Sequence, residues 1–281
     1  MKKNAFSILE LSIVLIIIGL LTAGVVKGGA MIKSSRLAGA RAITSSSEIV
    51  KIDGLLAWFE PSMLDSILPQ ETIEGAPLTT WFDISPASIT LHKNIITKTA
   101  SNNVTYVSDG INNIPSIRFN GAENLKIDEL FQGPANQVTL FVVLRPEFSG
   151  GPKSTFFDAA LAGDDFSVTI HNGNLVLNAG NSFGLNGNIE SKKNYIIAAY
   201  FNFDNSTAYV NDAENIIGTA HVNAGSNALK GITIGTNKSG NSGFNGLISE
   251  IIIYNRPLKL NERKDVMRYL AKKYKINVGG I

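Results

Sequence analysis

One carboxylate interrupts an apolar stretch near the N-terminus. Glu10 lies within a mainly apolar run that extends from Phe6 to Val26. On insertion scales, a charged side chain at the centre of a bilayer costs about 2.5–3.5 kcal/mol, so an acid inside a membrane segment is expected to pair with a cation or to serve a function. Glu10 is therefore the first candidate for a functional residue.

The residues needed for thiol and histidine chemistry are scarce. The sequence contains no cysteine, which excludes disulfides, thiolate catalysis and cysteine metal sites. Its three histidines, His92, His171 and His221, are far apart and follow no metal-ligand spacing. We therefore expect no metal site built on these residue types, and we expect the histidines to be ordinary surface or turn residues.

The element that would position Glu10 is a long helix. From Phe6 to Val26 there are about 21 residues, which at 1.5 Å per residue is close to the thickness of a bilayer core. Lys2 and Lys3 precede the run, so the positive-inside rule places the N-terminus in the cytoplasm and the rest of the chain beyond the membrane. A secretory signal peptide or a plain membrane anchor would fit this pattern, but neither gives Glu10 a role.

The order Ala5-Phe6-Ser7-Ile8-Leu9-Glu10 after a short basic start resembles the N-terminus of type IV prepilins and pseudopilins. This resemblance implies a leader of residues 1–5, removed between Ala5 and Phe6 by a prepilin peptidase, and methylation of the new terminus. It also implies that Glu10 pairs with the N-terminal amine of a neighbouring subunit during assembly. The family prefers glycine at the position of Ala5. The hydrophobic transmembrane and assembly segment is expected to cover residues 6–50, and its helix is expected to end near Ser45-Ser46-Ser47.

Residues 51–281 show a different pattern. Apolar and polar residues alternate in short segments separated by Gly, Asn, Asp and Ser, which predicts strands joined by tight turns. The clearest predicted strands are residues 137–144, 165–170, 194–203, 207–210, 231–235 and 246–254. A final helix is predicted with Asn261 as its cap and an apolar stripe of Val266, Met267, Leu270 and Tyr274.

This region resembles bacterial concanavalin A-like (laminin G-like) domains. The matching segments are LLAWFE (55–60), WFD (81–83), IPSIRFNG (114–121), LFVV (140–143), GLISEIIIYNRPL (246–258) and YLAKKY (269–274). The resemblance implies a mainly β fold, a two-sheet jelly-roll sandwich that follows the N-terminal helix and ends in a C-terminal helix. Trp58 and Trp81 could stack on a sugar, but the resemblance places both at positions that usually serve the core, and we favour the core role.

Relatives of this fold often bind calcium through loop carboxylates, which makes Asp164, Asp165 and Asp204 the calcium candidates. Calcium takes six to eight oxygen ligands, and one or two acids in each loop fall short of that number. We therefore favour a turn role for these acids, and we expect no cofactor other than calcium.

Catalysis by a jelly-roll glycanase needs two carboxylates on one strand, because one protonates the leaving oxygen while the other attacks. Glu123, Asp128 and Glu129 do not have the required spacing, and Glu250 stands alone in an apolar strand. No catalytic residue is identified, and we expect that the chain is not an enzyme.

The chain is therefore expected to be a pilin-like subunit, specifically a minor pilin, because a head of this size is large for a major one. It would be held in the bacterial inner membrane with its head outside the cytoplasm, and would reach the cell surface if assembled into a pilus. Its expected partners are prepilin peptidase, other pilin subunits and a glycan or surface protein. Removal of Lys2 and Lys3 leaves basic and acidic side chains in balance, so nucleic acid is not an expected partner. The alternatives are a type II secretion pseudopilin and a membrane-tethered, lectin-like domain that does not assemble.

Overall fold

The structure is a computed structural model in which seven ranges of the chain are described: residues 8–86, 95–98 (backbone only), 104–130, 133–148, 153–161, 165–218 and 221–281. Ala5, Phe6, His92 and Asp164 lie outside the described residues. The chain divides into two compact units, residues 1–39 and 40–281. The boundary falls inside the first helix, and the two units are described separately.

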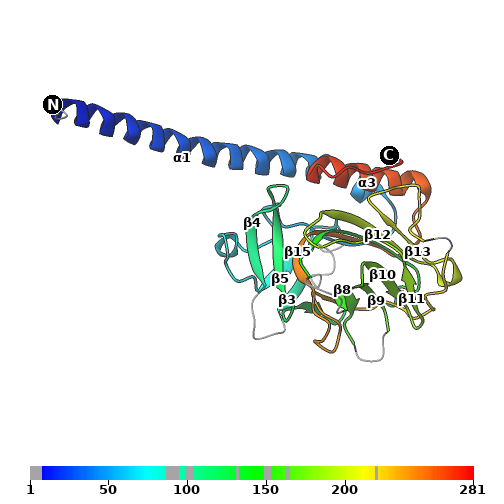
Figure 1. Cartoon of the computed structure of the whole chain (residues 1–281). Coiled ribbons are helices and arrows are strands. Elements are labelled where there is room, and N and C mark those ends of the chain that lie inside the picture. The colour runs from blue at the N-terminus through cyan, green and yellow to red at the C-terminus, as the bar shows by residue number, and fades with distance from the viewer. Residues whose placement is uncertain are drawn as a thin grey trace. The chain divides into compact units, whose positions relative to one another are not determined.

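The first unit consists of helix α1, which as a whole runs from Ile8 to Ser45 (Figure 1). Its apolar side chains are exposed through most of its length. Two hydroxyl groups in this apolar stretch bond back to carbonyl oxygens of the preceding turn: Ser12 Oγ donates to Ile8 O and Thr22 Oγ1 to Ile18 O, each at 2.8 Å. Their polar groups are thereby satisfied within the helix.

By length and composition, this helix is the one candidate membrane span among the described residues. A helix of this kind near the N-terminus could anchor the chain in a membrane, and a signal sequence meets the same criterion.

The second unit contains two antiparallel sheets. Sheet A has the strand order β13 (Thr207–Val210), β12 (Tyr195–Phe201), β7 (Val138–Pro146), β15 (Asn245–Tyr254), β5 (Ile114–Asn120) and β4 (Thr105–Ile111), and β1 (Leu55–Phe59) pairs with the second half of β15. Sheet B has the order β11 (Ser182–Leu185), β10 (Asn174–Asn178), β9 (Ser167–His171), β8 (Ser154–Ala159), β14 (Ile232–Ile234), β6 (Leu125–Ile127), β3 (Ile95–Lys98) and β2 (Thr80–Phe82). Short 3₁₀ turns η1 (Ile49–Lys51), η2 (Pro69–Glu71) and η3 (Phe203–Asn205) lie between strands or before the first one.

The main core lies between the two sheets. Phe119 and Val142 of sheet A and Phe157, Val168 and Leu177 of sheet B belong to one buried cluster. Along each strand the inward residues alternate with outward ones, as the pleat requires. The fold is therefore a sandwich whose two inner faces form the core.

A second core covers the outer face of sheet A. Helix α3 (Leu260–Tyr274) packs its apolar stripe there. Val266, Met267 and Leu270 share a buried cluster with Phe141 and Ile252 of the central strands. The central strands of sheet A are buried on both faces for this reason, which explains their nearly continuous apolar sequence.

The predicted fold class is confirmed: a long N-terminal helix, two antiparallel sheets and a C-terminal helix follow one another. The predicted cap of the last helix is wrong, because α3 begins at Leu260 and Asn261 lies within its first turn. The capping role belongs to Glu262, whose carboxylate accepts the backbone N–H of Lys259 at 2.8 Å and closes the first turn.

Candidate functional site

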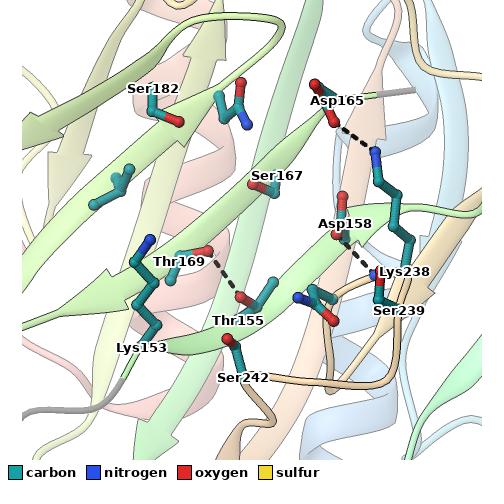
Figure 2. Close-up of a pocket in the computed structure, with 13 residues that line it drawn as sticks. Lys153, Thr155, Asp158, Asp165, Ser167, Thr169, Ser182, Lys238, Ser239 and Ser242 are labelled. Carbon is teal, nitrogen blue, oxygen red and sulfur yellow. Dashed lines mark hydrogen bonds and ion pairs between the residues drawn. The ribbon is translucent and has the colours of Figure 1, made fainter. Parts of the chain in front are cut away.

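The outer face of sheet B carries polar side chains, in contrast to the helix-covered outer face of sheet A. A pocket of about 240 Å³ lies on this face over β8, β9, β10 and β11. It is lined by Lys153, Thr155, Asp158, Asp165, Ser167, Thr169, Val176, Asn178, Ser182, Asn237, Lys238, Ser239 and Ser242 (Figure 2). We call it the sheet B pocket.

Strand register explains why these residues share one face. Ser167 pairs with Asn178, which in turn pairs with Ser182 on the edge strand β11. Two residues further along β9 and β10, on the same face, Thr169 pairs with Val176. The residues between them in sequence point inward and belong to the core, so the alternation of the strands separates a polar outer face from an apolar inner one.

Two sets of contacts order the pocket. Thr155 Oγ1 and Thr169 Oγ1 are hydrogen-bonded at 2.9 Å. Asp158 accepts the backbone N–H of Lys238 at 2.8 Å and that of Ala159 at 2.7 Å. Asp158 thereby ties the loop that follows β14 to strand β8, as Figure 2 shows.

Of the two lysines that line the pocket, one forms an ion pair with another described residue and the other does not. The Nζ atom of Lys238 lies 2.6 Å from Asp165 Oδ1, whereas Lys153 has no ion-pair partner among the described residues. Burial raises the pKa of Asp158 to about 6, against the lowering effect of the two backbone N–H groups. The pocket therefore combines hydroxyls, amides and one exposed ammonium group, which together can donate and accept hydrogen bonds from a hydroxyl-rich ligand.

Of the three calcium candidates, Asp164 lies outside the described residues, and Asp165 and Asp204 are not brought together. Asp165 lies at the sheet B pocket in its ion pair with Lys238, while Asp204 is exposed in η3 and accepts the side-chain amide of Asn205 at 2.9 Å. Within the described ranges, no three His, Asp or Glu side chains lie close enough to hold a metal ion. Trp58 and Trp81 are 3% and 0% exposed, so both tryptophans lie in the core as predicted.

Sequence reasoning missed a buried ionic cluster between sheet A and α3. Lys273 Nζ lies 2.8 Å from Glu60 Oε1 and 2.9 Å from Glu250 Oε2, and all three side chains are fully buried. Burial raises the pKa of Glu250, and the ammonium group of Lys273 opposes that rise. Two carboxylates therefore share one lysine in this cluster.

Neutral donors complete the shell of Glu250. Its Oε1 accepts Trp58 Nε1–H at 2.6 Å and the Tyr269 hydroxyl at 2.7 Å, and its Oε2 accepts the Tyr274 hydroxyl at 2.9 Å. Thr44, in the last turns of α1, is hydrogen-bonded to the same Tyr269 hydroxyl at 3.2 Å. Because the cluster is fully buried, its role is to join residues 40–45, β1, β15 and α3 within the second unit, and it is not a ligand site.

Glu10 is exposed in the first turn of α1. The structure thus places Glu10 on an apolar helix with exposed side chains. Its predicted pairing with another subunit's terminus stays a prediction.

No protein-family model matches the sequence, and no curated protein has significant similarity to it. Solved structures with a similar fold include a sialidase from Trypanosoma rangeli in complex with sialic acid, at a TM-score of 0.53 and 16% identity over 79% of this chain and 34% of that one. Domain 4 of an extracellular arabinanase from Geobacillus stearothermophilus, in complex with arabinotriose, has a TM-score of 0.50 and 18% identity over 76% of this chain and 98% of that one.

The binding domain of botulinum neurotoxin serotype G has a TM-score of 0.54 and 11% identity over 77% of this chain and 51% of that one. This chain spans about a third of the length of the sialidase chains that it matches. At such low identities the likeness establishes the fold alone: a two-sheet sandwich that also occurs in these proteins.

Proposed function

We propose that this chain is a minor pilin-like subunit, anchored in the bacterial inner membrane before assembly, whose head binds a carbohydrate in the sheet B pocket. The observation that carries the assembly part is Glu10, one acid on an apolar helix that could span a membrane. In the proposed state the carboxylate pairs with the terminal amine of a neighbouring subunit, which offsets the cost of its charge and sets the axial register of the helices.

The polar outer face of sheet B supports the binding part. Hydroxyl, amide and ammonium groups line it. The arabinanase domain of similar fold was solved with arabinotriose, and the sialidase, of which about a third matches this chain, was solved with sialic acid. We propose binding without hydrolysis, because both pocket carboxylates have partners: Asp158 holds two backbone N–H groups and Asp165 holds Lys238.

Substitution of Glu10 tests the assembly part. We expect Glu10→Ala to reduce incorporation into filaments strongly while the protein still accumulates in the membrane, because the apolar helix remains and only the ionic partner is lost. Glu48→Ala is the control, since Glu48 lies beyond α1 and is exposed. If Glu10→Ala were incorporated as well as the unchanged protein, a tethered domain that does not assemble would be the better description.

A glycan array probed with the full-length protein in detergent micelles tests the binding part. Removal of one charge-assisted hydrogen bond is worth about 1.5–3 kcal/mol, so Lys153→Met should weaken binding of a captured glycan by roughly tenfold or more. Lys272→Met, a change at an exposed position of α3, should leave it unchanged. Absence of any bound glycan, with or without calcium, would favour a protein ligand instead.

A further inference from the structure

Four strands of sheet A bring a second pocket together at one end of the sheet. Strand β12 ends beside the start of β7, where Phe201 pairs with Val138. The end of β15 lies between the starts of β7 and β1, because Tyr254 pairs with both Thr139 and Leu55. The segments joined to these strand ends enclose a pocket of about 260 Å³. It is lined by Leu56, Gly133, Pro134, Ala135, Asn136, Gln137, Phe203 and Asn255.

Phe203 in η3 has an unusual backbone conformation. Its φ is +55°, a left-handed value that is sterically unfavourable for a bulky residue. Its side chain is 38% exposed, so burial of the ring does not explain the residue type. An exposed aromatic residue at a strained position points to a role outside the fold.

The surrounding loop holds Phe203 in place. The buried Ser206 donates its hydroxyl to Phe203 O at 2.8 Å and accepts the backbone N–H of Asn202 at 3.0 Å. A backbone bond from Asn205 N to Asn202 O at 2.9 Å closes the turn. The backbone that carries the ring is thus ordered before any ligand arrives, which lowers the entropic cost of binding.

The polar groups around Phe203 are side-chain amides. Gln137 Nε2 donates to Asn202 Oδ1 at 2.6 Å, which orients the Gln137 amide. Asn136 and Asn255 are exposed beside it. No charged side chain occurs among the described residues that line this pocket. Amides both donate and accept hydrogen bonds, as a ligand with many hydroxyl groups requires.

We propose that this pocket is a second binding site, for a neutral carbohydrate. The ring of Phe203 packs against the C–H face of a sugar, Leu56 supplies an apolar contact, and the amides of Asn136, Gln137 and Asn255 bond its hydroxyls. The site shares no residue with the sheet B pocket, so it stands whether or not that pocket binds a ligand.

Saturation-transfer NMR tests the site with full-length protein in detergent micelles and a panel of neutral sugars: glucose, galactose, mannose, arabinose and N-acetylglucosamine. We expect at least one sugar to give a signal that is lost in Phe203→Gly. Because glycine adopts a positive φ without strain, the same variant should unfold at a temperature no lower than that of the unchanged protein. Phe203→Tyr should keep the signal, since the ring remains.

Phe183→Ala is the matched control, because Phe183 is an exposed phenylalanine on β11 with no positive φ. It should leave the signal unchanged. All of these variants are compared in a Lys153→Met background, which weakens any binding in the sheet B pocket so that the signal reports the pocket around Phe203. The proposal fails if no neutral sugar binds in the Lys153→Met background, or if the signal survives when Phe203→Gly is added to it.

Discussion

At the scale of single residues, Glu250 shows that the role of a side chain depends on its position in the fold. In the sequence it is one acid inside an apolar strand. In the structure it accepts hydrogen bonds from two tyrosines and a tryptophan and pairs with Lys273. These donors come from β1 and α3, so no local pattern around Glu250 reveals them. The carboxylate is retained as a structural element of the layer between sheet A and α3.

Loss of the lysine in this cluster should be severe. Lys273→Met leaves Glu60 and Glu250 buried without their cation, and breaking a buried ion pair in this way costs about 3–5 kcal/mol. We expect a large drop in the free energy of unfolding, measured by urea denaturation of the full-length protein. Lys272→Met, at the adjacent exposed position, should change it by less than about 0.5 kcal/mol. Equal effects of the two variants would contradict the structural role of the cluster.

At the scale of elements, the start of α3 depends on Glu262. This carboxylate accepts two hydrogen bonds from the Arg256 guanidinium, at 2.7 and 2.8 Å, besides the N–H of Lys259. The hydrogen bonds of Arg256 lower the pKa of Glu262 from 4.5 to about 2. One side chain thus fixes both the first turn of the helix and the segment that enters it from β15.

Glu262→Ala should therefore destabilise the protein in a pH-dependent way. At neutral pH we expect a loss of about 1 kcal/mol, the scale of a capping interaction, because the pair is partly exposed and screened by solvent. The stabilisation is fully present above pH 4.5 and is lost as the pH falls toward 2, since Glu262 is protonated in that interval. The difference between the variant and the unchanged protein, followed by thermal unfolding, should shrink over the same interval.

Asp265→Ala is the control for this prediction. Asp265 pairs with Arg268 on the exposed face of the same helix, with side chains about half exposed. Such a pair contributes little, so the variant should differ from the unchanged protein only slightly at any pH. A pH-independent effect of Glu262→Ala would mean that its ionised form is not what stabilises the helix.

At the scale of the whole molecule, one unit is an apolar helix and the other is a sandwich with its own cores. The exposed apolar side chains of α1 are unfavourable in water, and a bilayer or neighbouring helices would bury them.

We therefore expect the mature protein to remain in the membrane fraction after alkaline carbonate extraction, and mass spectrometry to give Phe6 as its first residue. The control for the extraction is a soluble periplasmic protein of the same cells, which carbonate should release. Release of this chain, with a terminus near Ala30, would identify residues 1–30 as a secretory signal and remove the basis for assembly.

The apolar helix, six of the fifteen described strands (β7, β9, β12, β13, β14 and β15) and the apolar stripe of α3 could be predicted from the sequence. Helical and strand periodicity are local properties that tertiary packing leaves unchanged here. The cap of α3 could not be predicted from the sequence. Asn261 is a residue type that commonly caps helices, whereas the start of the helix is fixed by Arg256 and Glu262. Of the residues that line the sheet B pocket, only Asp165 was singled out from the sequence, since the others, mainly serines, threonines, asparagines and lysines, form no motif.

The sequence by itself determined that Glu10 lies on an apolar helix. It also determined the alternation of apolar and polar residues that makes a two-sheet fold. Both features depend only on neighbours along the chain. Tertiary structure alone decided which sheet face stays open and where the strand ends gather around Phe203. It also decided that Glu250 would be enclosed. These features depend on pairing between distant segments: α3 covers sheet A and leaves the outer face of sheet B polar, and Trp58 reaches Glu250 across 192 residues of chain.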